Sequence, residues 1–113
     1  MRDERFCESY CPLTRAIGKI GNKWKPIIIN VMQERTIRFG QLDAIIPYIT
    51  RKVLTEQLKE LEADGILLRR AYKELPPKVE YSLTEQGLSL LPILKNIADW
   101  NTSYENNQPM MGM

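Results

Sequence analysis

The feature that most constrains the fold of this chain is a pair of short helical patterns separated by a tight turn. Leu42, Ile45 and Ile46 are spaced as on one side of a short helix, which Pro47 ends. Thr50 then provides an N-cap for a second helix, because its hydroxyl can accept a hydrogen bond from an N–H of the first turn. The spacing therefore predicts two helices joined by a tight turn.

A hairpin pattern follows the second helix directly. That helix extends to Asp64, and Gly65 suits the left-handed conformation that ends many helices. Residues 66–72 and 79–83 predict two strands, the second with strict apolar and polar alternation, and the loop between them is too long for a two-residue turn. Two helices, a tight turn and then a hairpin is the order of a winged helix-turn-helix, whose second helix enters the DNA major groove.

Two further helices are predicted before this unit. Pro12 begins the first, because the N–H that proline lacks would be unpaired at that position, and Gly21 with Asn22 ends it. A core helix is expected over residues 23–34, where one apolar stripe consists of Trp24, Ile27, Ile28, Val31 and Met32. The predicted fold class is mainly α, with a small β-hairpin wing.

The last helix, which Thr84 can cap, has more apolar surface than a small domain can bury. Its apolar residues cover more than half of the circumference, whereas packing on one core uses a stripe of about 100°. Pro92 is expected to kink this helix or to mark a restart. We therefore predict that the N- and C-terminal helices form a homodimer. The interface residues expected on the last helix are Leu90, Leu94, Ile97 and Trp100.

The length of 113 residues suits a single domain. We expect an N-terminal arm over residues 1–10, the winged domain with its dimerisation helix over 11–104, and a disordered tail over 105–113. No apolar run approaches the ~20 residues of a membrane span and the start leads into no signal peptide, so a cytoplasmic protein is expected. With two cysteines and no histidine, neither a four-coordinate zinc site nor histidine acid/base catalysis is expected. The chain is predicted to be neither an enzyme nor a cofactor-binding protein.

The charge is divided unevenly along the chain. Residues 15–78 have 13 basic and seven acidic side chains, whereas residues 1–14 have a net charge of −1 and residues 79–113 one of −3. A basic middle suggests a polyanion that meets one face, although solvated charge is the alternative. The DNA-binding residues predicted on the second helix are Thr50, Arg51, Lys52, Thr55, Gln57 and Lys59, and those on or near the wing are Arg69, Arg70, Lys73 and Lys78.

A series of short motifs runs from Cys11 to Trp100. The motifs are Cys11-Pro12, Ile20-Gly21, Lys23-Trp24, Arg38-Phe39-Gly40-Gln41-Leu42, Leu54-Thr55, Gln57-Leu58, Glu60-Leu61-Glu62, Asp64-Gly65, residues 76–84, Leu90-Leu91-Pro92 and Ala98-Asp99-Trp100. Each motif is weak alone, but their order and spacing together are specific. In these motifs the chain resembles the HxlR family of bacterial winged helix-turn-helix regulators, which are relatives of the MarR type. The chain departs from the pattern at Asn22, where the family usually has glycine; this change touches a helix start and puts nothing functional in doubt.

This resemblance implies a homodimeric repressor or activator of transcription. A two-fold dimer would read a palindromic double-stranded DNA operator with its two recognition helices. Several family members are similar in using the cysteine before the first helix to sense oxidants or electrophiles, such as quinones and aldehydes. The alternative is a winged-helix adaptor that binds another protein and no DNA.

Cys11 is the residue to which the sensing role would fall. Pro12 pushes it toward extended geometry at or beside the N-cap of the first helix, where unpaired N–H groups lower the pKa of a thiol, and Arg15 can add to this effect. Cys7 is the candidate resolving partner. The alternative is an inert structural thiol. A catalytic dithiol is disfavoured, because Cys-x3-Cys is not the Cys-x-x-Cys of thioredoxin-like enzymes.

Overall fold

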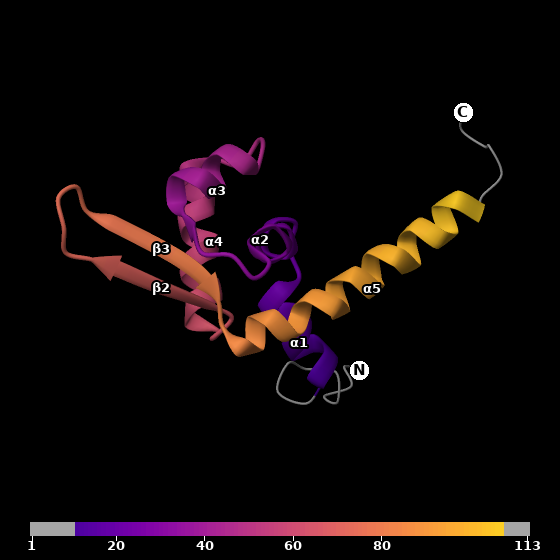
Figure 1. Cartoon of the computed structure of the whole chain (residues 1–113). Coiled ribbons are helices and arrows are strands. Elements are labelled where there is room, and N and C mark those ends of the chain that lie inside the picture. Colours follow the sequence, from indigo (N-terminus) through magenta and orange to yellow (C-terminus); the bar gives the residue numbers. More distant parts are fainter. Residues whose placement is uncertain (1–10, 108–113) are drawn as a thin grey trace.

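The computed structural model describes residues 11–107, which form five helices and one three-stranded antiparallel sheet (Figure 1). This architecture confirms the prediction of a mainly α winged helix-turn-helix. In chain order the elements are α1 (Pro12–Ile20), α2 (Trp24–Met32), β1 (Ile37–Arg38), α3 (Phe39–Ile45), α4 (Arg51–Ala63), β2 (Leu67–Tyr72), β3 (Lys78–Leu83) and α5 (Glu85–Asn107).

Local chemistry sets the limits of the helix-turn-helix. Between α3 and α4, Tyr48 has a φ of 68°, the left-handed conformation that reverses the chain. Thr50 caps α4 as expected, because its Oγ1 accepts a hydrogen bond from Val53 N at 3.1 Å. Gly65, with a φ of 78°, ends the helix in the way that its sequence position predicts.

The wing is the β2–β3 hairpin, in which Leu67 pairs with Leu83 and Tyr72 with Lys78. Strand β1 was not predicted, because two residues are too few for a period-2 pattern. It pairs with β3 at Ile37 and Tyr81, so the sheet order is β1-β3-β2. The sheet is thereby attached to the helices at its base, and the far end of the hairpin extends away from them (Figure 1).

The core lies between α2, α3, α4 and the base of the sheet. Its largest fully buried side chains are Ile28, Ile29, Met32, Leu42, Ile46, Leu54, Leu58, Leu61 and Ile66. The predicted stripe of α2 was wrong by about one position, because the buried residues of this helix are Lys25, Ile28, Ile29 and Met32. Trp24 and Val31 are partly buried at the edge of the core, and Ile27 is exposed.

Helix α5 packs on this core only through its first half, where Leu90, Leu91 and Leu94 are partly buried. Its second half extends away from the rest of the chain (Figure 1). The helix includes Pro92 without a restart and ends at Asn107, past the boundary that we expected at residue 104. No helix in residues 11–107 is both long and apolar enough to cross a bilayer.

Candidate nucleic-acid interface

Helix α4 has one buried face and one exposed polar face. Leu54, Leu58 and Leu61 are 0%, 1% and 0% exposed, and they fix the helix to the core. Positions on the opposite side of an α-helix from these leucines fall at Lys52, Glu56 and Lys59, and all three side chains are exposed. Thr55, beside them, is half-buried. We call Lys52, Thr55, Glu56 and Lys59 the outer face of α4.

The first residues of α4 also hold the two helices of the motif together. The Arg51 side chain donates from Nε to Asp43 Oδ2 on α3 at 3.2 Å, and its guanidinium lies 5.5 Å from the centre of the Phe39 ring. This side chain is still 72% exposed. The hydroxyl of Thr55 donates to the backbone carbonyl of Arg51 at 2.8 Å. Thr50 and Arg51 therefore have structural partners and remain at the surface.

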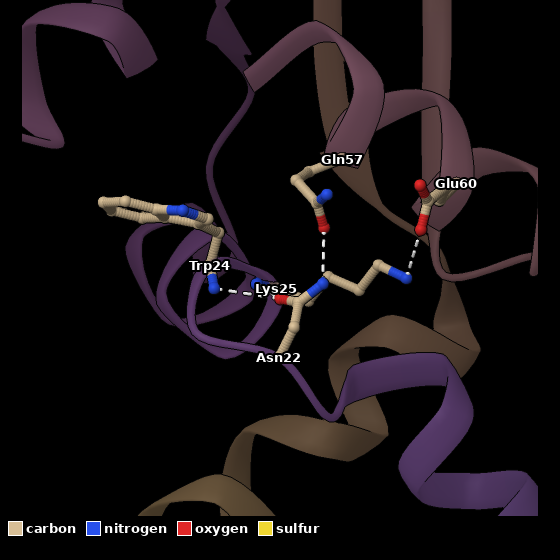
Figure 2. Close-up of polar contacts among 5 residues, drawn as sticks. All are labelled: Asn22, Trp24, Lys25, Gln57 and Glu60. Carbon is tan, nitrogen blue, oxygen red and sulfur yellow. Dashed lines mark hydrogen bonds and ion pairs between the residues drawn. The ribbon is translucent and has the colours of Figure 1, made fainter. Parts of the chain in front are cut away.

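Gln57 does not belong to the outer face. Its side chain is half-buried, and its Oε1 accepts a hydrogen bond from Asn22 Nδ2 at 2.8 Å (Figure 2). It therefore lies on the flank of α4 that faces the corner between α1 and α2. This position gives no support to its predicted role as a residue presented to bases.

The basic residues of the wing divide between the two faces of the sheet, because successive strand residues point to opposite sides. Arg69 lines a groove of about 300 Å³ between the wing and α4, together with Thr55, Lys59 and Tyr81. Arg70 is exposed on the opposite face, across from Glu80. Only Arg69 extends the basic surface of α4.

Lys78 and Lys73 both lie at the end of the hairpin, but their surroundings differ. The Lys78 ammonium lies 3.9 Å from Glu74 Oε1 and 3.6 Å from Glu80 Oε2, and 4.5 Å from the centre of the Tyr72 ring. Its charge is largely compensated inside the wing. Lys73 is exposed at the start of the loop.

Sequence reasoning missed a polar cluster behind α4. Lys25 is only 5% exposed, and its Nζ lies 2.7 Å from Glu60 Oε1 (Figure 2). The signal was present in the sequence, because Lys25 precedes Ile28, Ile29 and Met32 at the i, i+3, i+4 and i+7 spacing of one helix face. In the sequence, Asn22 was interpreted as a departure from the family's glycine without functional consequence. In the structure its side chain connects α2 with α4.

Cys11 is the N-cap of α1, as predicted, with φ −91° and ψ 112°. The residue is partly exposed. The hydroxyl of Thr14 lowers the pKa of this thiol most, and the Thr14 backbone N–H lowers it next. Desolvation acts in the opposite direction and raises the pKa, whereas the Leu13 N–H and the Arg15 charge lower it further. Sequence reasoning expected the N–H groups and Arg15 but missed Thr14. Cys7 lies outside the described residues.

A second surface, formed by α1, α2 and α5, is apolar. A groove of about 700 Å³ is lined by Ile17, Ile27, Leu91, Leu94 and Ile97, among others. Of the predicted interface residues, Leu94 and Ile97 line this groove, and Leu90 instead lines a smaller hollow against α1. Trp100 lies further along α5, 64% exposed, with its ring 5.8 Å from that of Tyr104.

The family model described as HxlR-like helix-turn-helix matches residues 19–109. An HTH-type transcriptional regulator of Halalkalibacterium halodurans, BH0655, is 47% identical over 97 residues, which are 85% of this chain and 86% of that protein. One from Methanothermobacter thermautotrophicus is 39% identical over 105 residues, 93% of this chain and 80% of that protein.

Among solved structures, the redox regulator HypR in its reduced form is similar to this chain, with a TM-score of 0.79 and 45% identity. The match covers 84% of this chain and 94% of that one. The oxidised form of HypR matches with a TM-score of 0.76 over 88% of this chain and 100% of that one.

Proposed function

The chain belongs to the HxlR-like helix-turn-helix family of transcriptional regulators, and from this premise we propose that it binds a palindromic DNA operator as a homodimer, with α4 in the major groove. The observation that carries this proposal is the outer face of α4. This face is polar and exposed, with two lysines, and Arg69 of the wing lies beside it. A helix that reads DNA needs such a face free of contacts with its own domain.

The contacts expected on DNA are of two kinds. Lysine and arginine ammonium and guanidinium groups neutralise phosphates whatever the sequence, and this role suits Lys59, Arg69 and Lys73. Side chains near the start of a recognition helix reach base edges, and this role suits Arg51 and Lys52. Among the residues predicted from sequence, Gln57 and Lys78 have internal contacts that count against such a role.

The dimer is proposed from the apolar groove and the second half of α5. Ile97 is 51% exposed and Trp100 64%, and this half of the helix extends away from the other helices and strands of residues 11–107 (Figure 1). A second copy of the same helix is the occupant that covers both surfaces by two-fold symmetry. Such a dimer would place its two α4 helices about one turn of DNA apart, ~34–36 Å.

A salt titration with random duplex DNA tests DNA binding without knowledge of the operator. Each phosphate that the protein neutralises releases counterions, so log K should fall with log salt by about 0.9 per contact. We expect micromolar or tighter binding at low salt, with a slope of several contacts. An absence of binding at low salt would contradict the proposed function and would favour a protein-binding adaptor.

We further propose that Cys11 makes DNA binding responsive to oxidants or electrophiles. Its extended N-cap position and its lowered pKa favour the thiolate, which is the reactive form of cysteine. The likeness to a redox regulator solved in reduced and oxidised forms supports this role. Oxidation to sulfenic acid or addition of a quinone would modify the N-cap of α1.

The test compares operator affinity before and after mild diamide or quinone treatment, for the unmodified protein and for Cys11→Ser. We expect treatment to change the affinity of the unmodified protein and to leave that of the variant unchanged. An equal response in both proteins would contradict a role for Cys11, because the modification would then act elsewhere.

A further inference from the structure

We propose that Asn22 and Lys25 hold the recognition helix in its DNA-reading orientation through a polar latch, which we define as Asn22, Lys25, Gln57 and Glu60. Two contacts form the latch, Asn22 to Gln57 and Lys25 to Glu60, and in each case the partners are far apart in sequence (Figure 2). This inference rests on the proposed DNA binding by α4 and adds the residues that set the position of that helix.

The hydrogen bonds of Asn22 fix the orientation of its amide. Its Oδ1 accepts from the backbone N–H groups of Trp24 at 2.9 Å and Lys25 at 2.8 Å, and so caps the start of α2. Since backbone N–H groups can only donate, the Nδ2 of Asn22 must point the other way, where Gln57 Oε1 accepts from it at 2.8 Å. One side chain thus joins the first turn of α2 to the middle of α4.

Lys25 makes the second contact of the latch, and its side chain is buried. Its side chain is 6% exposed, and the Nζ–Oε1 distance to Glu60 is 2.7 Å. A buried ammonium needs a charged or polar partner, because its desolvation is otherwise uncompensated. Glu60 is one helical turn from Gln57, so both contacts of the latch engage the same flank of α4.

The latch restricts motions that the core leaves open. Leu54, Leu58 and Leu61 fix α4 by apolar burial, which is not directional and tolerates small rotations or shifts along the helix axis. Hydrogen bonds, including the charged one between Lys25 and Glu60, are directional and weaken steeply as the donor angle bends. Contacts on the flank therefore determine which side chains of the outer face point away from the protein.

The latch also connects α4 to α1 over a very short path. Gly21 ends α1, and a Cβ at this position would collide with the backbone carbonyl of Ile17, so the corner has no room for a side chain. Asn22 follows directly. A movement of α1, which borders the apolar groove through Ile17, is thereby transmitted to α4 through one residue.

Asn22→Ser is the variant that separates the latch from the cap. A serine hydroxyl still caps α2, but it is too short to reach Gln57. The DNA probes are a duplex enriched by in vitro selection with the unmodified protein and an unrelated duplex of the same length. We expect affinity for the selected duplex to fall several-fold, up to about tenfold, with affinity for the unrelated duplex and the melting temperature unchanged.

Gln57→Ala and the double variant complete the test. If the two amides act as a pair, Asn22→Ser has no further effect in the Gln57→Ala background. If Gln57 instead contacts a base directly, Gln57→Ala lowers the selected affinity and Asn22→Ser alone does not, which would overturn the latch. Equal losses on both duplexes for Asn22→Ser would also overturn it. Failure of the unmodified protein to enrich any sequence would contradict the proposed function instead.

Discussion

Helices α4 and α5 each have an uncovered side, and the chemistry of these two sides differs. On α4 the three leucines are buried, and the side opposite them is charged or polar. On α5 the apolar residues continue into solvent, with Ile93, Ile97, Trp100 and Tyr104 all exposed. Water solvates the first surface at little cost, whereas the second surface is destabilised by contact with water. This difference suits the two roles proposed above, with DNA against α4 and a second copy of the chain against α5.

The substitution with the largest expected effect lies on α5. Ile97→Asp would place an unpaired carboxylate in the proposed interface, where burial of the charge costs several kcal/mol. We expect a monomer or an aggregate at micromolar concentration, measured by sedimentation velocity. Asn96→Asp adds the same charge at an exposed neighbour that does not line the apolar groove, and it should remain dimeric. A stable monomer for the unmodified protein would contradict the interface.

A smaller effect is expected when one charge is removed from α4. Lys59→Ala leaves a residue of high helix propensity, so the fold should persist, but one phosphate contact is lost. Affinity for any duplex should fall at low salt, and the salt slope should decrease by about 0.9. Arg35→Ala removes the same charge from the exposed turn after α2, at a residue that lines neither the groove between the wing and α4 nor the apolar groove, and serves as the matched control. Equal losses for both variants would mean that net charge, and not the outer face, determines binding.

The smallest effect concerns the start of α1, beside the apolar surface. Because the pKa of the Cys11 thiol is lowered, its thiolate should persist at a pH where an ordinary cysteine is protonated, and its reactivity should fall only as the pH drops through this lower value. Thr14→Val removes the hydroxyl that lowers this pKa most, so the reactivity midpoint should move to higher pH. Alkylation by iodoacetamide, followed at the Cys11 peptide by mass spectrometry, measures both midpoints. An unchanged midpoint would exclude the Thr14 hydroxyl as the main cause.

The parts of the fold that could be predicted are those set by local chemistry. Pro47 and Gly65 were predicted to end helices and Thr50 to begin one, each through its own backbone or side-chain properties. In the structure each of them lies at or beside the predicted helix boundary. The order of the elements follows from such signals. The likeness to a winged helix-turn-helix was therefore accessible from one sequence.

The parts that could not be predicted depend on partners distant in the chain. Helix α2 has six apolar residues, so periodicity alone could not tell which side meets the core and which borders the groove. The contact of Asn22 with Gln57 spans 35 positions. The spacing of Lys25 indicates that it is buried, but nothing nearby in the sequence identifies Glu60 as its partner. Lys78 was predicted to bind DNA on the basis of its positive charge alone. Its pairing with Glu80 follows from the strand that the two residues share.

The most direct test of the account is a hydroxyl-radical footprint of the unmodified protein on a duplex that it selects from a random pool. We expect two protected segments related by two-fold symmetry, with centres about one helical turn apart, because two copies of α4 joined through α5 would occupy successive major grooves. Ile97→Asp should lose this paired pattern. A single protected half-site for the unmodified protein, or protection without symmetry, would contradict the assignment of α4 to DNA and α5 to the dimer.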